Sequence, residues 1–122
     1  MEQLTFTKTF TPQEKDSALS MGSGNLQVLA TPSMIAFMEN VAMNCAMPKL
    51  QDGYTTVGTL LNIKHLKASK IGEPIVATAK LVEEDGRRLV FHVSVTNGKG
   101  DLLGEGTHER FIVNADRFMG KL

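Results

Sequence analysis

Cysteine is almost absent from this sequence, because Cys45 is the only one among the 122 residues. A single cysteine cannot form an intrachain disulfide, so we expect a reducing, cytoplasmic setting. Cys45 lies in an apolar segment, which favours packing over reactivity. With 42% hydrophobic residues the chain can build one core without disulfides or metals, and we expect a single domain over residues 1–122.

Net charge is also absent, since 13 Lys and Arg balance 13 Asp and Glu. This balance argues against nucleic acid and acidic membranes as partners. The first ten residues alternate polar and apolar side chains, as a signal peptide would not. The longest stretch poor in charge, 17–48, is interrupted by Gly22, Gly24 and Pro32, so it does not suit a bilayer. We expect a soluble protein with no membrane or nucleic-acid partner.

Motifs for metals and phosphates are missing as well. The three histidines and the cysteine lie far apart, without a short ligand spacing. No phosphate-binding glycine motif is present. We therefore expect no metal site.

One helix is predicted, from Thr31-Pro32 to about Met47. Threonine is a good N-cap, proline is favoured at the first helical position, and Pro48 cannot continue the helix. Residues 17–30 lack periodicity and contain two glycines, which favours a loop or lid.

Strands account for most of the remaining chain. Alternation predicts an opening strand over 3–10 and four long strands over 54–66, 73–84, 87–97 and 102–114. Asp85-Gly86 and Asn97-Gly98 are hairpin signals, so the last three strands should form an antiparallel meander. This order predicts an α+β fold in which a curved antiparallel sheet covers one side of the helix. The uncovered side and a free strand edge predict a homodimer.

Glu39 stands out because it is the only charged residue between Asp16 and Lys49, and its helical neighbours are apolar. Burying an unpaired carboxylate costs several kcal/mol, so a buried Glu39 would need a cation or a hydrogen-bond donor. The alternative is a glutamate that points into solvent or holds a loop by hydrogen bonds.

His65 and Thr31 are the other candidates for chemistry. In the strand from Tyr54, odd positions from Val57 to His65 share one face with apolar side chains, so His65 is either a satisfied core or rim histidine or a catalytic one. A carboxylate within reach would orient the imidazole, as in a catalytic triad. Thr31 either caps the helix or supplies a hydroxyl near the positive end of its dipole.

Two histidines remain. His92 lies on the polar side of its strand and is predicted to be at the surface. His108 shares one face with Arg110 in GEGTHERFIV, where a solvated strand end and a ligand contact are equally compatible with the pattern.

The sequence resembles the fluoroacetyl-CoA thioesterases, a branch of the hotdog-fold acyl-CoA thioesterases. The resemblance rests on Thr31, Glu39 and His65, the Ala30-Thr31-Pro32 triplet that opens the helix, Gly58-Thr59 and GEGTHERFIV. The likeness covers most of the chain. It implies a hotdog fold, in which one long central helix is wrapped by a curved five-stranded antiparallel sheet, and a homodimer with paired sheet edges.

The resemblance also implies hydrolysis of an acyl-CoA thioester by Thr31, Glu39 and His65. Substrate contacts would come from Gly58, Thr59 and Arg110, and CoA would enter only as part of the substrate, without a separate cofactor. The family has aromatic side chains in the loop before the helix, whereas MGSGNLQVLA has none. Its apolar residues Met21, Leu26 and Val28 suit a less selective pocket for short or medium acyl groups.

Two mechanisms fit these residues. Either Thr31 attacks the thioester, or a water held by Glu39 does, while His65 transfers protons. Other functions are a non-catalytic acyl-CoA-binding or regulatory hotdog module and a structural dimerisation domain. A hydratase would be expected to carry an Asp/His pair at the helix start, which this sequence lacks.

Overall fold

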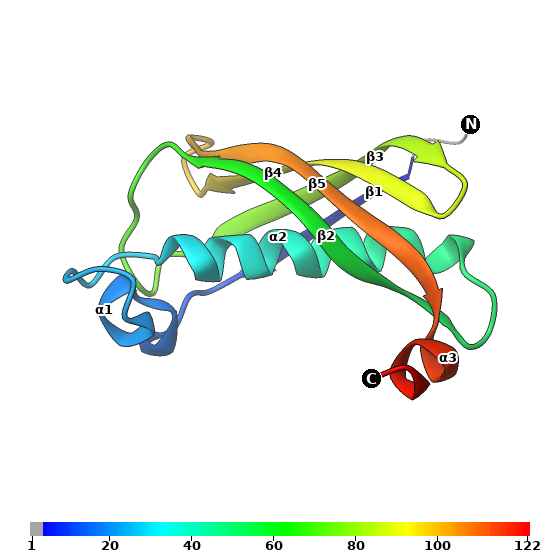
Figure 1. Cartoon of the computed structure of the whole chain (residues 1–122). Coiled ribbons are helices and arrows are strands. Elements are labelled where there is room, and N and C mark those ends of the chain that lie inside the picture. The colour runs from blue at the N-terminus through cyan, green and yellow to red at the C-terminus, as the bar shows by residue number, and fades with distance from the viewer. Residues whose placement is uncertain (1–3) are drawn as a thin grey trace.

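The computed structural model describes residues 4–122, and in it a five-stranded antiparallel sheet curls over one long helix (Figure 1). The elements are β1 (Thr5–Phe10), α1 (Ala18–Met21), α2 (Thr31–Ala46), β2 (Tyr54–His65), β3 (Ile75–Asp85), β4 (Arg88–Asn97), β5 (Leu102–Asn114) and α3 (Ala115–Gly120), with 3-10 turns at Glu14–Asp16 and Met47–Lys49. The strand order is β1-β3-β4-β5-β2. The predicted α+β fold with one long central helix is confirmed.

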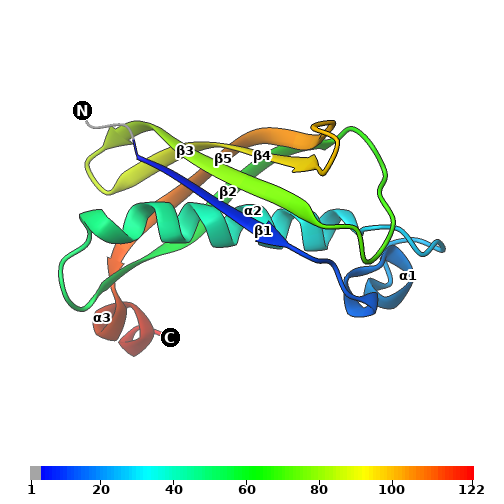
Figure 2. The ribbon, with the colours of Figure 1, turned by 180° about the vertical axis from the view of Figure 1, so that it is seen from behind.

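The predicted meander is also confirmed, because β3 pairs with β4 and β4 with β5, all antiparallel. The other two strands form the edges of the sheet: β1 pairs with β3, and β2 pairs with β5. Figure 2, seen from behind, shows β1 at the front, crossing α2. The two free edges are therefore β1 and β2. The predicted opening strand is seen from Thr5, and Gln3 lies outside the described residues.

The core lies between α2 and the inner face of the sheet. In β4 the predicted alternation holds, since Leu89, Phe91, Val93 and Val95 are fully buried and His92 is exposed. The helix contributes a matching set of buried side chains: Met34, Met38, Val41, Ala42, Cys45 and Ala46. Cys45 is thus a packing residue, and burial raises the pKa of its thiol.

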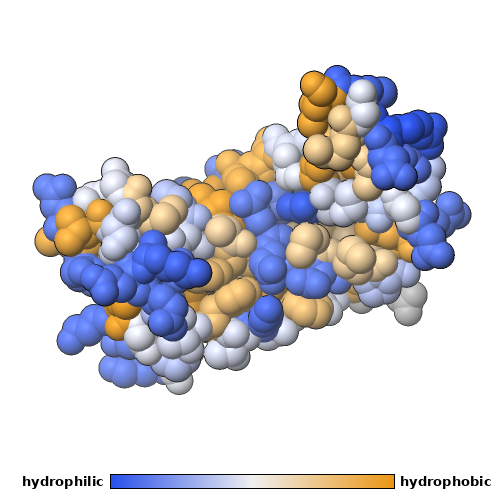
Figure 3. Space-filling model, turned by 90° about the horizontal axis from the view of Figure 1, so that it is seen from below, coloured by the Kyte–Doolittle hydropathy of each residue, from blue (hydrophilic) through white to orange (hydrophobic). Residues whose placement is uncertain are grey.

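The side of α2 away from the sheet stays open. Ala36 is exposed and Glu39, Asn40 and Met43 are only half-buried. Figure 3 views this side of the molecule, where apolar and polar side chains alternate along its length. Within residues 4–122 no helix is long and apolar enough to cross a membrane.

Two short helices were not predicted. Ser17 caps α1 by accepting a hydrogen bond from the Ser20 amide at 3.0 Å, and Asn114 caps α3 through the Arg117 amide, also at 3.0 Å. They have four and six residues, which is too short for a helical hydrophobic period to show in the sequence.

A β-bulge at Thr59 changes which side chains of β2 face inward. The register with β5 shifts between Gly58 and Leu60. Before the bulge the inward positions are Thr56 and Gly58, and after it they include Ile63 and His65. The expectation that Val57 and Thr59 share a face with His65 is therefore wrong, because an extra residue reverses the alternation.

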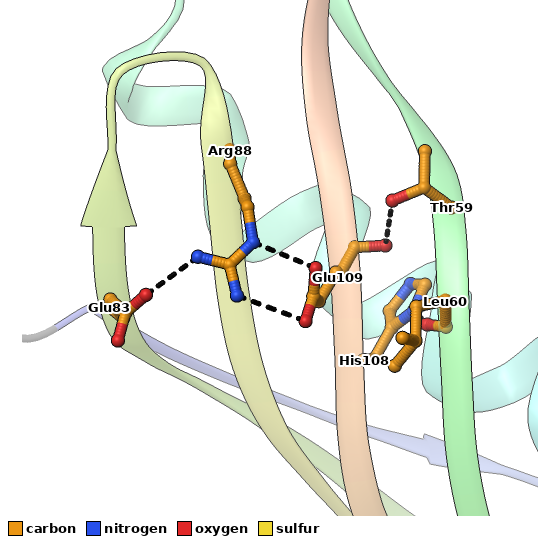
Figure 4. A network of polar contacts seen from close by, with 6 residues as sticks. All are labelled: Thr59, Leu60, Glu83, Arg88, His108 and Glu109. Carbon is orange, nitrogen blue, oxygen red and sulfur yellow. Dashed lines mark hydrogen bonds and ion pairs between the residues drawn. The ribbon is translucent and has the colours of Figure 1, made fainter.

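An ion-pair network braces the outer face of the sheet beside this bulge (Figure 4). Arg88 donates two hydrogen bonds to the Glu109 carboxylate, at 2.9 and 3.1 Å, and a third to Glu83 at 2.7 Å. The carbonyl of Glu109 accepts a hydrogen bond from the Thr59 hydroxyl at 3.3 Å. The hydrogen bonds from Arg88 lower the pKa of Glu109 below its ordinary value.

This lowered pKa predicts an acid-sensitive contribution to stability. A carboxyl group with a lower pKa in the folded state stabilises the fold above its unfolded pKa, and the contribution is lost as the pH falls through the folded value. We expect Glu109→Gln to lower the free energy of unfolding at neutral pH, with a difference from wild type that shrinks below the ordinary value of 4.5. Urea unfolding between pH 3 and 7 measures it. In an Arg88→Met background the same substitution should show no such pH dependence; if it does, Arg88 is not the cause.

Candidate active site

A threonine and a histidine meet where α2 begins and β2 ends. The Thr31 Oγ1 lies 2.8 Å from the His65 Nδ1. The expected N-cap role of Thr31 is wrong: Ala30 occupies the N-cap position without a side-chain cap, and Thr31 is the first helical residue. Its hydroxyl bonds to the imidazole instead of to the helix backbone.

The environment of His65 favours the neutral imidazole. Burial lowers its pKa, and the Lys67 backbone opposes this shift. A neutral ring that accepts the Thr31 proton at Nδ1 carries its own hydrogen on Nε2. That Nε2 is buried and has no hydrogen-bond partner among the described residues. In that tautomer the pair has a base facing the hydroxyl, and the Nε2 hydrogen on the other side of the ring has no acceptor.

A cavity of about 330 Å³ opens onto this pair. The segment before α2 forms one wall and is tied to the 66–70 loop, since the Leu29 amide donates to the Ser69 carbonyl at 2.9 Å. Of the three lid residues proposed from the sequence, Val28 lines the cavity, whereas Met21 and Leu26 are exposed and do not. The lining residues include no aromatic side chain other than the imidazole: Ala18, Ser23, Val28, Leu29, Thr31, His65, Leu66, Lys67 and Ala68.

A second polar cluster surrounds Gly58 farther along β2. A Cβ placed on Gly58 would lie 3.0 Å from the Glu39 Oε2 and 3.3 Å from both the Arg110 Nη1 and the His108 Cε1. These three side chains therefore converge on the one residue that has no side chain to exclude them. Glu39 is half-buried among apolar side chains. The nearby Arg110 guanidinium is the cation that such a carboxylate was expected to need.

Arg110 and His108 form the floor of this cluster. Arg110 is 7% exposed and donates to the Thr56 hydroxyl at 2.8 Å, the Thr56 carbonyl at 3.0 Å and the His108 Nε2 at 3.2 Å. The His108 Nδ1 donates to the Leu60 carbonyl at 2.8 Å (Figure 4), so both ring nitrogens fit a neutral imidazole. Burial lowers the pKa of both residues.

The solvated strand end considered for His108 and Arg110 is therefore wrong, because both side chains are buried. His108 was not among the site residues proposed from the sequence. A signal for it exists: His108 shares the parity of Arg110 on β5, while Glu105 and Glu109 take the opposite, outer face.

The structure does not bring Glu39 to His65 within one chain. No hydrogen bond or ion pair joins them: the Nδ1 of His65 contacts Thr31, and its Nε2 has no partner among the described residues. Eight helical residues separate Thr31 from Glu39, which is about 12 Å along the axis. Thr59 belongs to neither cluster, because its hydroxyl bonds to the Glu109 carbonyl.

Solved structures with this architecture define the class of protein. A thioesterase superfamily member from Thermus thermophilus superposes with a TM-score of 0.90 at 22% identity, covering 98% of this chain and 88% of that one. The architecture is thus the hotdog fold.

Comparison with known sequences is more specific. The family "Fluoroacetyl-CoA-specific thioesterase" matches residues 12–116. The fluoroacetyl-CoA thioesterase of Streptantibioticus cattleyicolor is 34% identical over 96 residues, which cover 79% of this chain and 68% of that protein. The crystal structure of a fluoroacetyl-CoA-specific thioesterase variant matches with a TM-score of 0.91 and 29% identity, over 99% of this chain and 94% of that one. This chain belongs to the fluoroacetyl-CoA-specific thioesterase family.

The resemblance inferred from the sequence is therefore confirmed, and the chain is homologous to a thioester hydrolase. Crystal structures of fluoroacetyl-CoA thioesterase variants contain acetyl-CoA in one case and fluoroacetate with CoA in another. These ligands were found in the related proteins.

The buried Arg110 gives a prediction about stability. Thr56→Val keeps the shape of the side chain but removes the hydroxyl that accepts from the Arg110 Nε. We expect a loss of about 1.5–3 kcal/mol in the free energy of unfolding, as for other hydrogen bonds to charged groups. Urea unfolding measures it, with Thr55→Val on the same strand as the matched control. Equal losses in the two variants would contradict a special role for the Thr56 hydroxyl.

Proposed function

We propose that this protein, folded as one domain, hydrolyses acyl-CoA thioesters with a short or medium acyl group to the free acid and CoA. Thr31, Glu39 and His65 form the catalytic set. The observation that carries the proposal is the 2.8 Å contact between the Thr31 hydroxyl and the His65 imidazole at the mouth of a cavity. A hydroxyl that faces a neutral imidazole is the arrangement that nucleophilic acyl transfer needs.

In the first route the Thr31 oxygen attacks the thioester carbonyl and His65 takes its proton at Nδ1. The carbon–sulfur bond then breaks, the thiolate of CoA receives that proton, and water hydrolyses the acyl-threonine. The negative oxygen of the intermediate would lie at the start of α2, where N–H groups have no intrahelical acceptor. In the second route a water held by Glu39 attacks directly. Trapping an acyl-Thr31 species by mass spectrometry separates the two routes.

Glu39 reaches the other two residues if the protein is a homodimer. The β2 strand is a free edge, and it exposes two large apolar side chains, Leu60 at 42% and Leu61 at 39%. Antiparallel pairing of two such edges about a two-fold axis would bring the His65 end of one strand toward the Gly58 and Glu39 region of the other. The buried Nε2 of His65 would then have a carboxylate acceptor within reach.

The remaining residues of the second cluster would hold the acyl end of the substrate. Gly58 leaves space beside the Glu39 carboxylate for a carbonyl group and offers its backbone N–H there. Arg110 supplies a buried positive charge. A contact between Thr59 and the substrate would require its hydroxyl to leave the Glu109 carbonyl. The cavity beside Thr31 is lined by both aliphatic and polar side chains, without phenyl or indole rings, which suits short or medium acyl groups more than one selected group.

Substitution of the acid and the base tests the activity. We expect Glu39→Gln and His65→Ala each to lower kcat by on the order of 10²-fold or more, as does the loss of a positioned acid or base. Release of free thiol from a panel of acyl-CoA esters measures it. His92→Ala, at the sheet surface, is the matched control and should retain wild-type turnover. CoA-ester binding without turnover in the wild type would instead favour the non-catalytic binding module.

A site that takes Glu39 from one chain and His65 from the other makes a separate prediction about mixed dimers. A heterodimer of a Glu39→Gln chain and a His65→Ala chain has one site in which both residues are intact, provided that each site draws them from different chains. Co-expressed, differently tagged chains purified through both tags should therefore recover up to half of wild-type activity. If each site uses Glu39 and His65 of the same chain, both sites are damaged and activity stays at the level of the single variants.

A further inference from the structure

Of the three histidines only His108 is fully buried, with 0% of its surface exposed, and the proposed function gives it no role. In the sheet it lies between Phe91 of β4 and Leu61 of β2, and the Phe91 ring centroid is 6.3 Å from that of the imidazole. Solvent does not reach the ring. Any effect of His108 on the chemistry must therefore act through the groups that it contacts.

Both ring nitrogens of His108 have a partner, and these partners fix the position of its hydrogen. The Nδ1 lies 2.8 Å from the Leu60 carbonyl, which can only accept, and the Nε2 lies 3.2 Å from the Arg110 Nη1, which can only donate. A neutral ring with its hydrogen on Nδ1 satisfies both contacts. Burial is the main cause that lowers the pKa of His108, and the charge of Arg110 lowers it further, while the Leu60 carbonyl and Glu39 oppose this shift. His108 is therefore an acceptor for Arg110.

The guanidinium of Arg110 is held at all three of its nitrogens. Its Nε donates to the Thr56 hydroxyl at 2.8 Å and its Nη2 donates to the Thr56 carbonyl at 3.0 Å, so Thr56 holds one edge of the plane. The third nitrogen, Nη1, has the Nε2 of His108 as its only hydrogen-bond partner within residues 4–122. His108 therefore holds the opposite edge of the guanidinium.

The Nη1 is also the part of Arg110 that reaches the space beside Gly58. It lies 3.3 Å from the position that a Cβ on Gly58 would take, and the Glu39 Oε2 lies 3.0 Å from the same position. Nη1 carries two hydrogens, and only one of them is used by His108. The second hydrogen is left for a group that enters the space beside Gly58.

We propose that His108 is a positioning residue, which holds the Arg110 Nη1 so that one N–H faces the substrate space beside Gly58 and Glu39. This inference rests on the proposed function, because it assumes that the acyl end of the substrate occupies that space. An acyl oxygen there would receive a hydrogen bond from a donor that is oriented before the substrate binds. The alternative is a histidine that contributes only to stability.

The other nitrogen of His108 has a separate, structural contact. Leu60 is the first residue after the register shift in β2, and its carbonyl accepts the Nδ1 hydrogen (Figure 4). This bond ties the bulged part of β2 to the imidazole on β5. One ring thus stabilises the bulge through Nδ1 and orients Arg110 through Nε2, and the two contacts can be removed separately.

Two amide substitutions separate these contacts. An asparagine amide reaches the position of Nδ1, so His108→Asn can still donate to the Leu60 carbonyl but has no acceptor near Arg110. A glutamine amide reaches the position of Nε2, so His108→Gln can still accept from Arg110 but loses the bond to Leu60. We expect His108→Asn to lower kcat/KM for an acyl-CoA by about tenfold or more, as for a lost hydrogen bond to a charged group, and His108→Gln to keep most of the activity. Release of free thiol measures both.

Urea unfolding of the same two variants tests the structural alternative. If His108 contributes only to stability, activity should fall in the order in which stability falls. On our proposal His108→Asn is the less active variant without being the less stable one. His92→Asn and His92→Gln, at an exposed position of β4, are the matched controls and should retain wild-type activity. Wild-type kcat/KM in His108→Asn, or equal losses in the two His108 variants, would overturn the proposal.

A double-mutant cycle shows whether His108 acts through Arg110. The guanidinium is absent in an Arg110→Met background, so His108→Asn should then cause little further loss of kcat/KM, whereas independent effects would multiply. A further loss as large as that in the wild-type background would contradict the proposal.

Nitrogen-15 NMR of the ligand-free wild type requires neither a variant nor turnover. At neutral pH we expect the His108 hydrogen on Nδ1 and an unprotonated Nε2, and a hydrogen on Nε2 would overturn the proposal. A wild type that shows the expected tautomer but does not hydrolyse acyl-CoA esters refutes the proposed function. A wild type that hydrolyses them, together with a fully active His108→Asn, refutes only the positioning role.

Discussion

The hydrogen bond between Thr31 and His65 joins the first residue of α2 to the last residue of β2, and the candidate site depends on this junction. It forms because the first residue of the helix lies beside the last residue of β2, an edge strand of the sheet. The contact places the Thr31 hydroxyl on the Nδ1 of His65, and burial lowers the pKa of the imidazole, which favours its neutral form. It also explains why a threonine opens the helix without capping it.

The bulge at Thr59 is the second constraint, because it decides what β2 presents to the helix. A regular strand would keep one parity from Tyr54 to His65, and either Gly58 or His65 would then face outward. With one extra residue both face inward, so a single strand serves two polar clusters. The Arg88–Glu109 pair on the outer face braces the strand opposite the bulge.

Much of this fold could be predicted from the sequence, because long elements leave long patterns. The β5 strand was predicted with its observed bounds, and the alternation in β4 gave its buried face correctly. The α1 and α3 helices were missed because they are shorter than a helical period can reveal. The relation between Thr31, Glu39 and His65 was only partly accessible, since their spacing pointed to a family but a bulge and an open helix face determine which of them meet. His108 was missed because the alternation in GEGTHERFIV fits a solvated strand end as well as a buried face.

Membership of the family does not determine which acyl group is preferred. We expect the segment 17–30 before the helix to determine it. Selectivity between acyl groups that differ by one small substituent needs side chains that contact that substituent, and an apolar pocket discriminates weakly between similar shapes. Here the segment 17–30 presents Ala18, Ser23, Val28 and Leu29 to the cavity, with Met21 and Leu26 exposed. Aliphatic side chains fill space without the directed electrostatics of an aromatic ring. We therefore expect the size of the cavity to set the range of acyl groups that this protein accepts.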